Sequence, residues 1–265
     1  MPHLLDNLPR LKEIIIRQPF GLITDMDGSI SPNPVTFQEP SIPDENQKLL
    51  TLLAPKCALV AVISGRQTIA IKNMVNVDGV KYIGHYGMER WENNQAAEHS
   101  SVRPYISPMR AVAAQIETLR AIPNLIIQDK YLTISIHYHL CENQNEVRKH
   151  ILDLLSESRE SQNLRVIEEK ANIGILPPVA IDKGTAVSGL LQEYRLKSAI
   201  FIGDDTADVP GFRTLRRANR DAGFKGLAVL VTGQNTPAHI VNEADYSLDG
   251  FGETTKLLKW LSLNL

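Results

Sequence analysis

Short, nearly continuous apolar runs recur along the chain, and segments with helical spacing lie between them. The runs are residues 20–24, 58–63, 199–202 and 227–231. Runs of this kind are typical of strands that are buried on both faces of a parallel sheet. Residues 49–53 and 187–194 repeat their apolar positions at the spacing of a helix. This alternation predicts an α/β fold with a doubly wound parallel sheet.

The middle of the chain has a different pattern. Ser107 and Pro108 indicate the start of a helix, with serine as the N-cap and proline at the first position. Residues 132–138 alternate between apolar and polar, which predicts a strand with one buried face. Residues 147–155 have helical spacing again, and residues 164–167 suit another strand. We therefore expect a small α+β domain here.

This domain interrupts the α/β pattern rather than following it. Pro104 precedes it, and the pair Pro177 and Pro178 follows it. We expect an inserted α+β cap at residues 104–178, within a core formed by residues 1–103 and 179–265.

Composition excludes several classes of protein. The net charge is −2, with 28 basic and 30 acidic residues, and the absence of a basic run argues against a nucleic-acid partner. No run of about 18 apolar residues is present, and charged residues interrupt the N-terminal segment, so we expect neither a membrane span nor a signal peptide. Cys57 and Cys141 show no paired spacing, which suits free thiols in a cytoplasmic protein. The sequence does not distinguish a monomer from a small homo-oligomer.

The first candidate for chemistry directly follows the run at residues 20–24. It reads Asp25-Met26-Asp27-Gly28-Ser29. Two carboxylates in this arrangement suit phosphoryl transfer, because one can attack phosphorus while the other handles the proton of the leaving group. The alternative is a turn rich in aspartate that has no chemical role.

Two further candidates could bind phosphate. Ser64, Gly65 and Arg66 end the second run and offer a hydroxyl and backbone N–H groups; the alternative is an ordinary helix N-cap. Lys183 opens the helix at residues 187–194, where the helix dipole favours anions rather than cations. A carboxylate cluster with a bound phosphate would compensate, whereas the alternative is a solvated surface lysine.

The fourth candidate, residues 203–208, follows the third run. Its three carboxylates, Asp204, Asp205 and Asp208, lie within five residues and repel one another unless a cation offsets them. Ligands that are all oxygen suit Mg²⁺. The alternative is a solvated acidic loop.

All four candidates lie at a strand end or a helix start, where open α/β sheets bind their ligands. In this order they resemble the motifs of the haloacid dehalogenase superfamily, which implies a Rossmann-like core with a type C2 cap. Residues 25–32 are similar to the DxDGTLSP stretch of trehalose-6-phosphate phosphatases, and residues 63–66, 87–89, 135–138, 182–184 and 203–205 also have counterparts there. The resemblance covers nearly the whole chain.

The resemblance implies a role for each matched residue. Asp25 would be the nucleophile, Asp27 the general acid and base, and Ser64 and Lys183 the ligands of the phosphoryl oxygens. The Mg²⁺ site would use Asp25, the main-chain carbonyl of Asp27, Asp204 and Asp208, with Asp208 supporting the metal shell or orienting Lys183. Arg66, Glu89 and His137 are the candidate substrate-binding residues. Asp205 is expected to brace its own loop.

Several positions depart from that family. Ser29 replaces a threonine, Tyr86 a histidine and His139 an arginine, while Gly174 and Leu176 replace an acid and a base. Buried polar contacts separate one sugar from another, so these changes affect the substrate more than the reaction. The polar positions of residues 133–139 remain candidates for binding sugar hydroxyls.

The sequence therefore predicts a magnesium-dependent sugar-phosphate phosphatase that forms an aspartyl-phosphate intermediate, most readily acting on trehalose 6-phosphate. The alternatives are a phosphatase for another sugar or glycosyl phosphate, and a phospho-acceptor signalling or binding protein without turnover. A nucleotide-binding dehydrogenase is disfavoured, since no GxGxxG follows the first strand.

Overall fold

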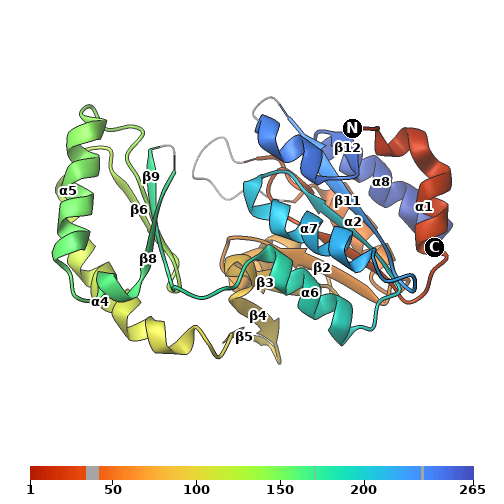
Figure 1. The fold of residues 1–265 in the computed structure, drawn as a ribbon, viewed down its shortest axis with the longest axis horizontal. Coiled ribbons are helices and arrows are strands. Elements are labelled where there is room, and N and C mark those ends of the chain that lie inside the picture. The colour runs from red at the N-terminus through yellow and green to blue at the C-terminus, as the bar shows by residue number, and fades with distance from the viewer. Residues whose placement is uncertain (34–41, 170, 234–235) are drawn as a thin grey trace. The chain divides into compact units, whose positions relative to one another are not determined.

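The computed structural model describes residues 1–33, 42–169, 171–233 and 236–265 (Figure 1). The chain forms two compact units, which we name the core unit and the inserted unit. The core unit comprises Met1–Ala97 and Ile181–Leu265, and the inserted unit comprises Glu98–Ala180. The insertion that we expected, residues 104–178, lies inside the second of these.

The core unit contains a sheet of eight strands in the order β12-β11-β10-β1-β2-β3-β4-β5. The strands from β12 to β3 are parallel, and β4 is antiparallel to β3. Their bounds are β1 (Phe20–Thr24), β2 (Leu59–Ile63), β3 (Lys81–Gly84), β4 (Glu89–Glu92), β5 (Gln95–Glu98), β10 (Ser198–Gly203), β11 (Lys225–Thr232) and β12 (Tyr246–Asp249). The four apolar runs are β1, β2, β10 and β11, which confirms the predicted doubly wound parallel sheet.

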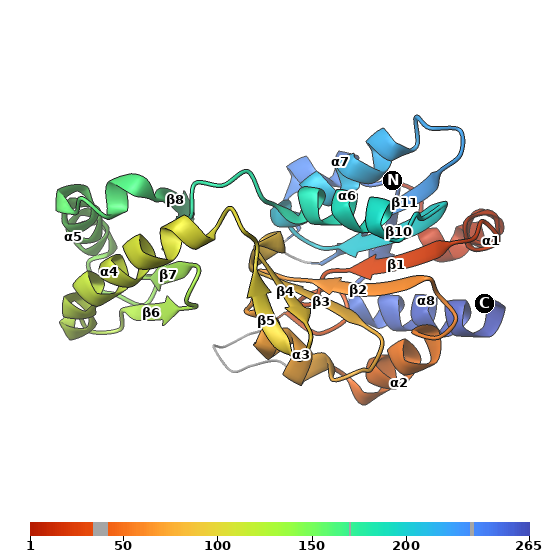
Figure 2. The ribbon, with the colours of Figure 1, turned by 90° about the horizontal axis from the view of Figure 1, so that it is seen from below.

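Helices cover both faces of this sheet (Figure 2). One face packs against α1 (Leu8–Ile15), α2 (Asp44–Leu53), α3 (Thr68–Val75) and α8 (Phe251–Asn264). The other face packs against α6 (Lys183–Glu193) and α7 (Val209–Ala218). Since successive strand residues point to opposite faces, Leu22 of β1 lies in the first hydrophobic core and Ile23 in the second. Burial on both faces explains why these strands are apolar throughout.

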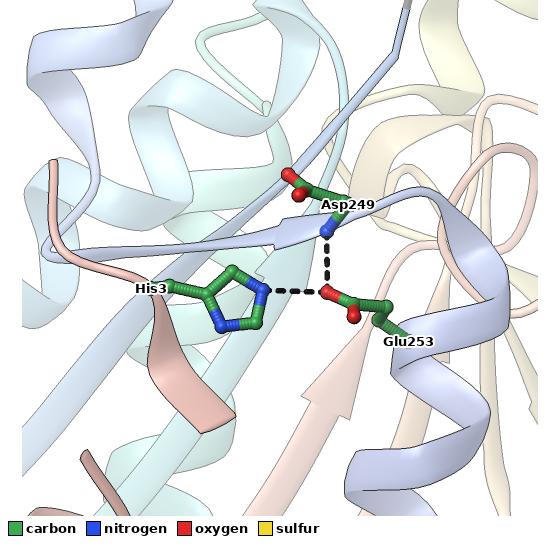
Figure 3. A group of neighbouring side chains, drawn as sticks. All are labelled: His3, Asp249 and Glu253. Atoms are coloured by element: carbon green, nitrogen blue, oxygen red, sulfur yellow. Dashed lines mark hydrogen bonds and ion pairs between the residues drawn. The ribbon is translucent and has the colours of Figure 1, made fainter. Parts of the chain in front are cut away.

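The first residues of the chain are tied to the C-terminal helix (Figure 3). The His3 ring lies 2.6 Å from a carboxylate oxygen of Glu253, in the first turn of α8. The same oxygen accepts the backbone N–H of Asp249 at 2.8 Å. The N–H of Ser247 donates to the carbonyl of Pro2 at 3.0 Å. These bonds attach the start of the chain to β12 and α8.

The inserted unit contains an antiparallel sheet in the order β6-β7-β9-β8. Its bounds are β6 (Ile126–Asp129), β7 (Ile134–His137), β8 (Arg165–Glu169), β9 (Asn172–Leu176), α4 (Ile106–Ile116) and α5 (Gln144–Glu157). In β7, Ile134 and Ile136 are buried whereas Ser135 and His137 are partly exposed. The predicted alternation is therefore confirmed. One face of the sheet shares a hydrophobic core with α4 and α5.

The predicted start of the first helix in this unit is wrong by a short margin. The helix begins at Ile106, and Tyr105 occupies the N-cap position without a side-chain hydrogen bond. A 3₁₀ turn at Arg103–Tyr105 leads directly into the helix, so no serine cap is needed.

The remaining short helices are 3₁₀ turns. They are η1 (Leu4–Asn7), η2 (His85–Gly87), η4 (Glu117–Ala121), η5 (Ser161–Asn163), η6 (Thr206–Asp208) and η7 (Ala238–Glu243). Among the described helices, none combines the length and the apolar character needed to span a membrane.

Candidate active site

Asp25 lies one residue beyond the end of β1, between the neighbouring strands β10 and β2. Its backbone N–H donates to the carbonyl of Ile202 at 2.8 Å, which continues the strand pairing through Asp25 itself. The side chain is buried. Because parallel strands end at the same edge of a sheet, β1, β2 and β10 deliver Asp25, Ser64 and Asp204 to one region.

A tight turn follows Asp25 and requires glycine. Gly28 has a φ of 78°, and its N–H donates to the carbonyl of Ser31 at 2.9 Å. A Cβ atom on Gly28 would lie 2.0 Å from the carboxylate of Asp204. Glycine thus supplies the left-handed backbone and also the space into which the acidic loop fits.

Lys183 is the cation at the centre of the site. Its Nζ donates to Oδ1 of Asp25 and to Oδ1 of Asp208, both at 2.7 Å. Only 2% of its surface is exposed, so the alternative of a solvated surface lysine is wrong. Asp182 caps the helix by accepting the N–H of Thr185 at 2.8 Å. The two carboxylates compensate for a cation placed at a helix N-terminus.

The loop after β10 is a built structure rather than a solvated acidic loop. Oδ2 of Asp208, which is fully buried, accepts the N–H groups of Asp204 at 3.0 Å and Asp205 at 3.1 Å. Asp205 is exposed and accepts the N–H of Ala207 at 2.8 Å, so it braces the loop. A Cβ atom on Gly203 would lie 2.3 Å from Cγ of Asp208, which explains the glycine before the acids.

Asp25, Asp204 and Asp208 together fit a divalent cation. One carboxylate oxygen from each lies within 4.8 Å of the others. Burial raises the pKa of Asp25 and of Asp204 to about 7, against the opposing effects of Lys183 and Asn33 respectively. Burial disfavours the charge on Lys183, but Asp208 and Asp25 hold its pKa well above the ordinary value. Two buried carboxylates therefore share the Lys183 cation, and the partly buried Asp204 lies beside them. The all-oxygen donor set of the three acids suits Mg²⁺.

Asn33 is a member of the site that the sequence did not reveal. Its Nδ2 donates to Oδ2 of Asp204 at 3.0 Å. A single asparagine after Pro32 carries no signal by itself, since asparagine is common in turns. Only the approach of the two loops shows its role.

Ser64 and Arg66 follow β2. Ser64 is buried, and its hydroxyl accepts the N–H of Arg66 at 3.2 Å. The helix after it begins at Thr68, with Gln67 at the N-cap position, so the alternative of Ser64 as an ordinary helix cap is wrong. The Arg66 guanidinium binds both oxygens of Asp27, from Nε at 2.7 Å and from Nη2 at 3.0 Å.

The other two substrate-binding candidates lie elsewhere. Glu89 is buried, and its carboxylate accepts the N–H of Thr68 at 2.7 Å and also the Thr68 hydroxyl. His137 belongs to the inserted unit, where its ring lies 6.3 Å from that of His139 in an edge-on arrangement. Burial lowers the pKa of His137. The described contacts therefore unite Asp25, Lys183, Asp204 and Asp208, and they pair Asp27 with Arg66.

Comparison with known proteins gives a consistent family. The model of the trehalose-phosphatase family matches residues 23–249. An uncharacterized glycosyl hydrolase of Mycobacterium tuberculosis is 26% identical over 87% of this chain, which spans only 17% of that protein. The probable trehalose-phosphate phosphatase D of Arabidopsis thaliana is 24% identical over 92% of this chain and 68% of its own.

Solved structures share the fold. The trehalose-6-phosphate phosphatase of Aspergillus fumigatus superimposes with a TM-score of 0.68 over the whole of both chains, at 19% identity. Identity at this level supports the fold alone. The architecture inferred from the motifs, a haloacid dehalogenase-like core with an inserted α+β domain, is therefore confirmed.

Proposed function

The chain belongs to the trehalose-phosphatase family of phosphoric monoester hydrolases, and we propose that it is a magnesium-dependent sugar-phosphate phosphatase with trehalose 6-phosphate as its first candidate substrate. One observation carries the proposal. At the end of the central strand, buried Asp25 is bonded to buried Lys183 and lies beside two further carboxylates. A nucleophile, a cation and a potential metal site thus occupy one place.

The reaction proceeds in two displacements. A carboxylate oxygen of Asp25 attacks phosphorus, the bond from phosphorus to the sugar oxygen breaks, and Asp27 gives that oxygen its proton. Water then attacks the phosphorus of the aspartyl phosphate and loses a proton to Asp27. Phosphate leaves, and Asp25 and the proton on Asp27 are both restored.

Lys183 and Ser64 hold the phosphoryl oxygens during both steps. Asp25, the main-chain carbonyl of Asp27 and Asp204 would hold Mg²⁺, and Asp208 supports this shell while it orients Lys183. When bound, the ion neutralises negative charge on the phosphoryl group. Positioning and charge supply most of the catalysis in phosphoryl transfer.

The inserted unit selects the sugar. His137 and Ser135 lie on the partly exposed face of β7, where they can bind hydroxyl groups. At Gly174, a Cβ atom would lie 2.9 Å from the side chain of Ile167, so the acid found in the family does not fit without a shift of Ile167. Leu176 is buried. With these polar groups missing, we expect trehalose 6-phosphate to bind with a raised KM and other sugar phosphates to be hydrolysed as well.

A phosphate-release assay over a panel of sugar phosphates tests the proposal. Trehalose 6-phosphate should be hydrolysed faster than simple hexose phosphates, EDTA should abolish the activity and Mg²⁺ should restore it. Asp204→Ala should require more Mg²⁺ than Asp205→Ala, because only Asp204 lies in the ligand cluster. Activity that survives EDTA would refute the proposed dependence on Mg²⁺. Equal rates on simple hexose phosphates would refute the trehalose assignment alone.

A further inference from the structure

Arg66 is committed to Asp27 rather than free for substrate. Its Nε donates to Oδ2 of Asp27 at 2.7 Å and its Nη2 donates to Oδ1 at 3.0 Å. Both side chains are 23% exposed, so the pair is neither fully buried nor loosely solvated. Within the described residues, no other side chain makes a hydrogen bond or ion pair with Asp27. Arg66 alone therefore sets the orientation of this carboxyl group.

A strained turn fixes the backbone of Arg66 from one side. His85 and Tyr86 have φ values of 49° and 60°, a left-handed backbone that residues other than glycine rarely adopt. The N–H of His85 donates to the carbonyl of Arg66, and the N–H of Tyr86 donates to the carbonyl of Ser64, both at 2.9 Å. A Cβ atom on Gly65 would lie 2.5 Å from the Tyr86 ring. The strained turn thus hydrogen-bonds to the backbone on both sides of Gly65, at Ser64 and at Arg66.

Glu89 fixes the same segment where α3 begins. Its carboxylate accepts the N–H and the hydroxyl of Thr68. A Cβ atom on Gly84 would lie 2.6 Å from the nitrogen of Thr68, so β3 approaches the segment closely. The backbone of residues 64–68 is therefore hydrogen-bonded at both ends. The side chain of Arg66 extends from this fixed backbone.

We propose that Arg66 is a positioning residue that aims the carboxyl group of Asp27 at the leaving oxygen, and that it does not bind the phosphoryl group. The inference rests on the proposed function of Asp27. A guanidinium forms a planar fork that matches a carboxylate and fixes its plane, which a lysine ammonium cannot do. When Oδ1 carries the proton, Oδ2 can still accept from Nε. The orientation therefore persists through proton transfer.

The leaving group tests this role. A sugar oxygen must receive a proton as it departs, whereas p-nitrophenolate leaves without one. Arg66→Lys and Arg66→Ala should therefore lower kcat/KM for the preferred sugar phosphate about 10- to 100-fold, part of what a general acid contributes. The same variants should change kcat/KM for p-nitrophenyl phosphate by less than about 3-fold. The inhibition constant of inorganic phosphate should stay the same.

A double mutant separates positioning from a general structural role. In the Asp27→Ala background, Arg66→Ala should cause no further loss on the sugar phosphate, because the group that it aims is gone. Added guanidinium ion should restore part of the activity of Arg66→Ala but none of that of Asp27→Ala. Arg90→Ala is the matched control, since Nη1 of Arg90 donates to Glu193 at 2.8 Å and Arg90 has no hydrogen bond to Asp27 among the described residues. It should not distinguish the two substrates.

Two outcomes would overturn the positioning role of Arg66. Equal losses on both substrates with a raised inhibition constant for phosphate would make Arg66 a phosphate ligand and overturn the inference. Additive losses in the double mutant would overturn it as well. If the wild type hydrolyses neither substrate, the proposed function itself fails.

Discussion

The candidate active site of the core unit and the surface of the inserted unit use charge in different ways. In the core unit, Lys183 and Asp208 are almost completely removed from water, and Lys183 joins two carboxylates at 2.7 Å. In the inserted unit, the side chains of the ion pairs Arg148–Glu168 and Lys149–Asp153 are exposed. A buried charge that loses its partner remains uncompensated, whereas water replaces the partner of an exposed one. The buried ion pairs of Lys183 are therefore part of the fold of the core unit, whereas the two exposed pairs of the inserted unit are optional.

The contrast suggests a division of roles, with the reaction in the core unit and the choice of substrate in the inserted unit. The proposed reacting groups of the core unit are held by strand pairing, by two glycines that leave no space for a Cβ atom and by buried ion pairs. The polar face of β7 is partly exposed, and its side chains can change without opening the hydrophobic core. We therefore expect substitutions in the core unit to abolish turnover and those on β7 to redirect it.

The largest expected effect is at Asp25. Asp25→Asn keeps the shape of the side chain but removes the proposed nucleophile, so kcat should fall by at least about 10⁴-fold. Rapid quench with substrate labelled in the phosphoryl group should trap label on Asp25 of the wild type and none on the variant. Near-normal turnover by the variant would refute a covalent intermediate on Asp25.

Removal of the buried cation tests the contrast directly. Lys183→Met leaves the buried Asp25 and Asp208 without their cation, and the free energy of unfolding should fall by about 3–5 kcal/mol. Lys149→Met removes a lysine from an exposed pair, and its free energy of unfolding should stay within experimental error. Urea denaturation of both variants measures the difference. Equal effects would show that burial does not set the importance of these charges.

A substitution on β7 should change binding rather than chemistry. His137→Ala should raise KM for the preferred sugar phosphate about 5- to 10-fold, the loss expected for one hydrogen bond, with little change in kcat. Turnover of p-nitrophenyl phosphate should not change. His150→Ala, at an exposed position on α5, is the control. An equal effect of His137→Ala on both substrates would exclude β7 as a specificity surface.

The two cysteines allow the unfolding of each unit to be followed separately, because one lies in each unit. Burial raises the pKa of Cys57, in the core unit, to about 12, and it also raises the pKa of Cys141, in the inserted unit. A raised pKa lowers the thiolate fraction, so both thiols should react more slowly with a thiol reagent at pH 8 than an unperturbed cysteine does, and each rate should rise when its unit unfolds. Cys57→Ser and Cys141→Ser leave one thiol each. Their reaction rates at increasing urea should show whether the inserted unit opens first.

The sequence predicted the central strands of the core sheet better than the edge strands β4 and β5 of that sheet and β6 of the inserted unit, for a physical reason. Strands buried on both faces, such as β1 and β10, are apolar throughout and stand out as runs. The strands β4 and β5 are short and largely polar, and β6 is only partly buried, so no comparable pattern marked them. The start of α4 was misplaced because a preceding 3₁₀ turn replaces the serine cap.

The site was predictable where one residue type carries the chemistry. Asp25, Lys183 and Asp204 follow from carboxylates and a cation at strand ends and a helix start. Partners across the fold could not be predicted in this way, because the contact of Asn33 with Asp204 and that of Arg66 with Asp27 depend on how distant loops approach. Glu89 shows the same limit, since its buried bonds to Thr68 are invisible in the sequence.

The position of β1 between β10 and β2 has a consequence for synthesis on the ribosome. Phe20 pairs with Ser198, and the N–H of Asp25 finds its acceptor only at Ile202. The strand that leads into Asp25 must therefore wait for its second neighbour until the whole inserted unit and β10 have emerged. Contacts so distant in sequence form late and slowly. Until then, the apolar side chains of β1 lack one neighbouring strand, and a chaperone that binds exposed apolar segments would find a target in β1.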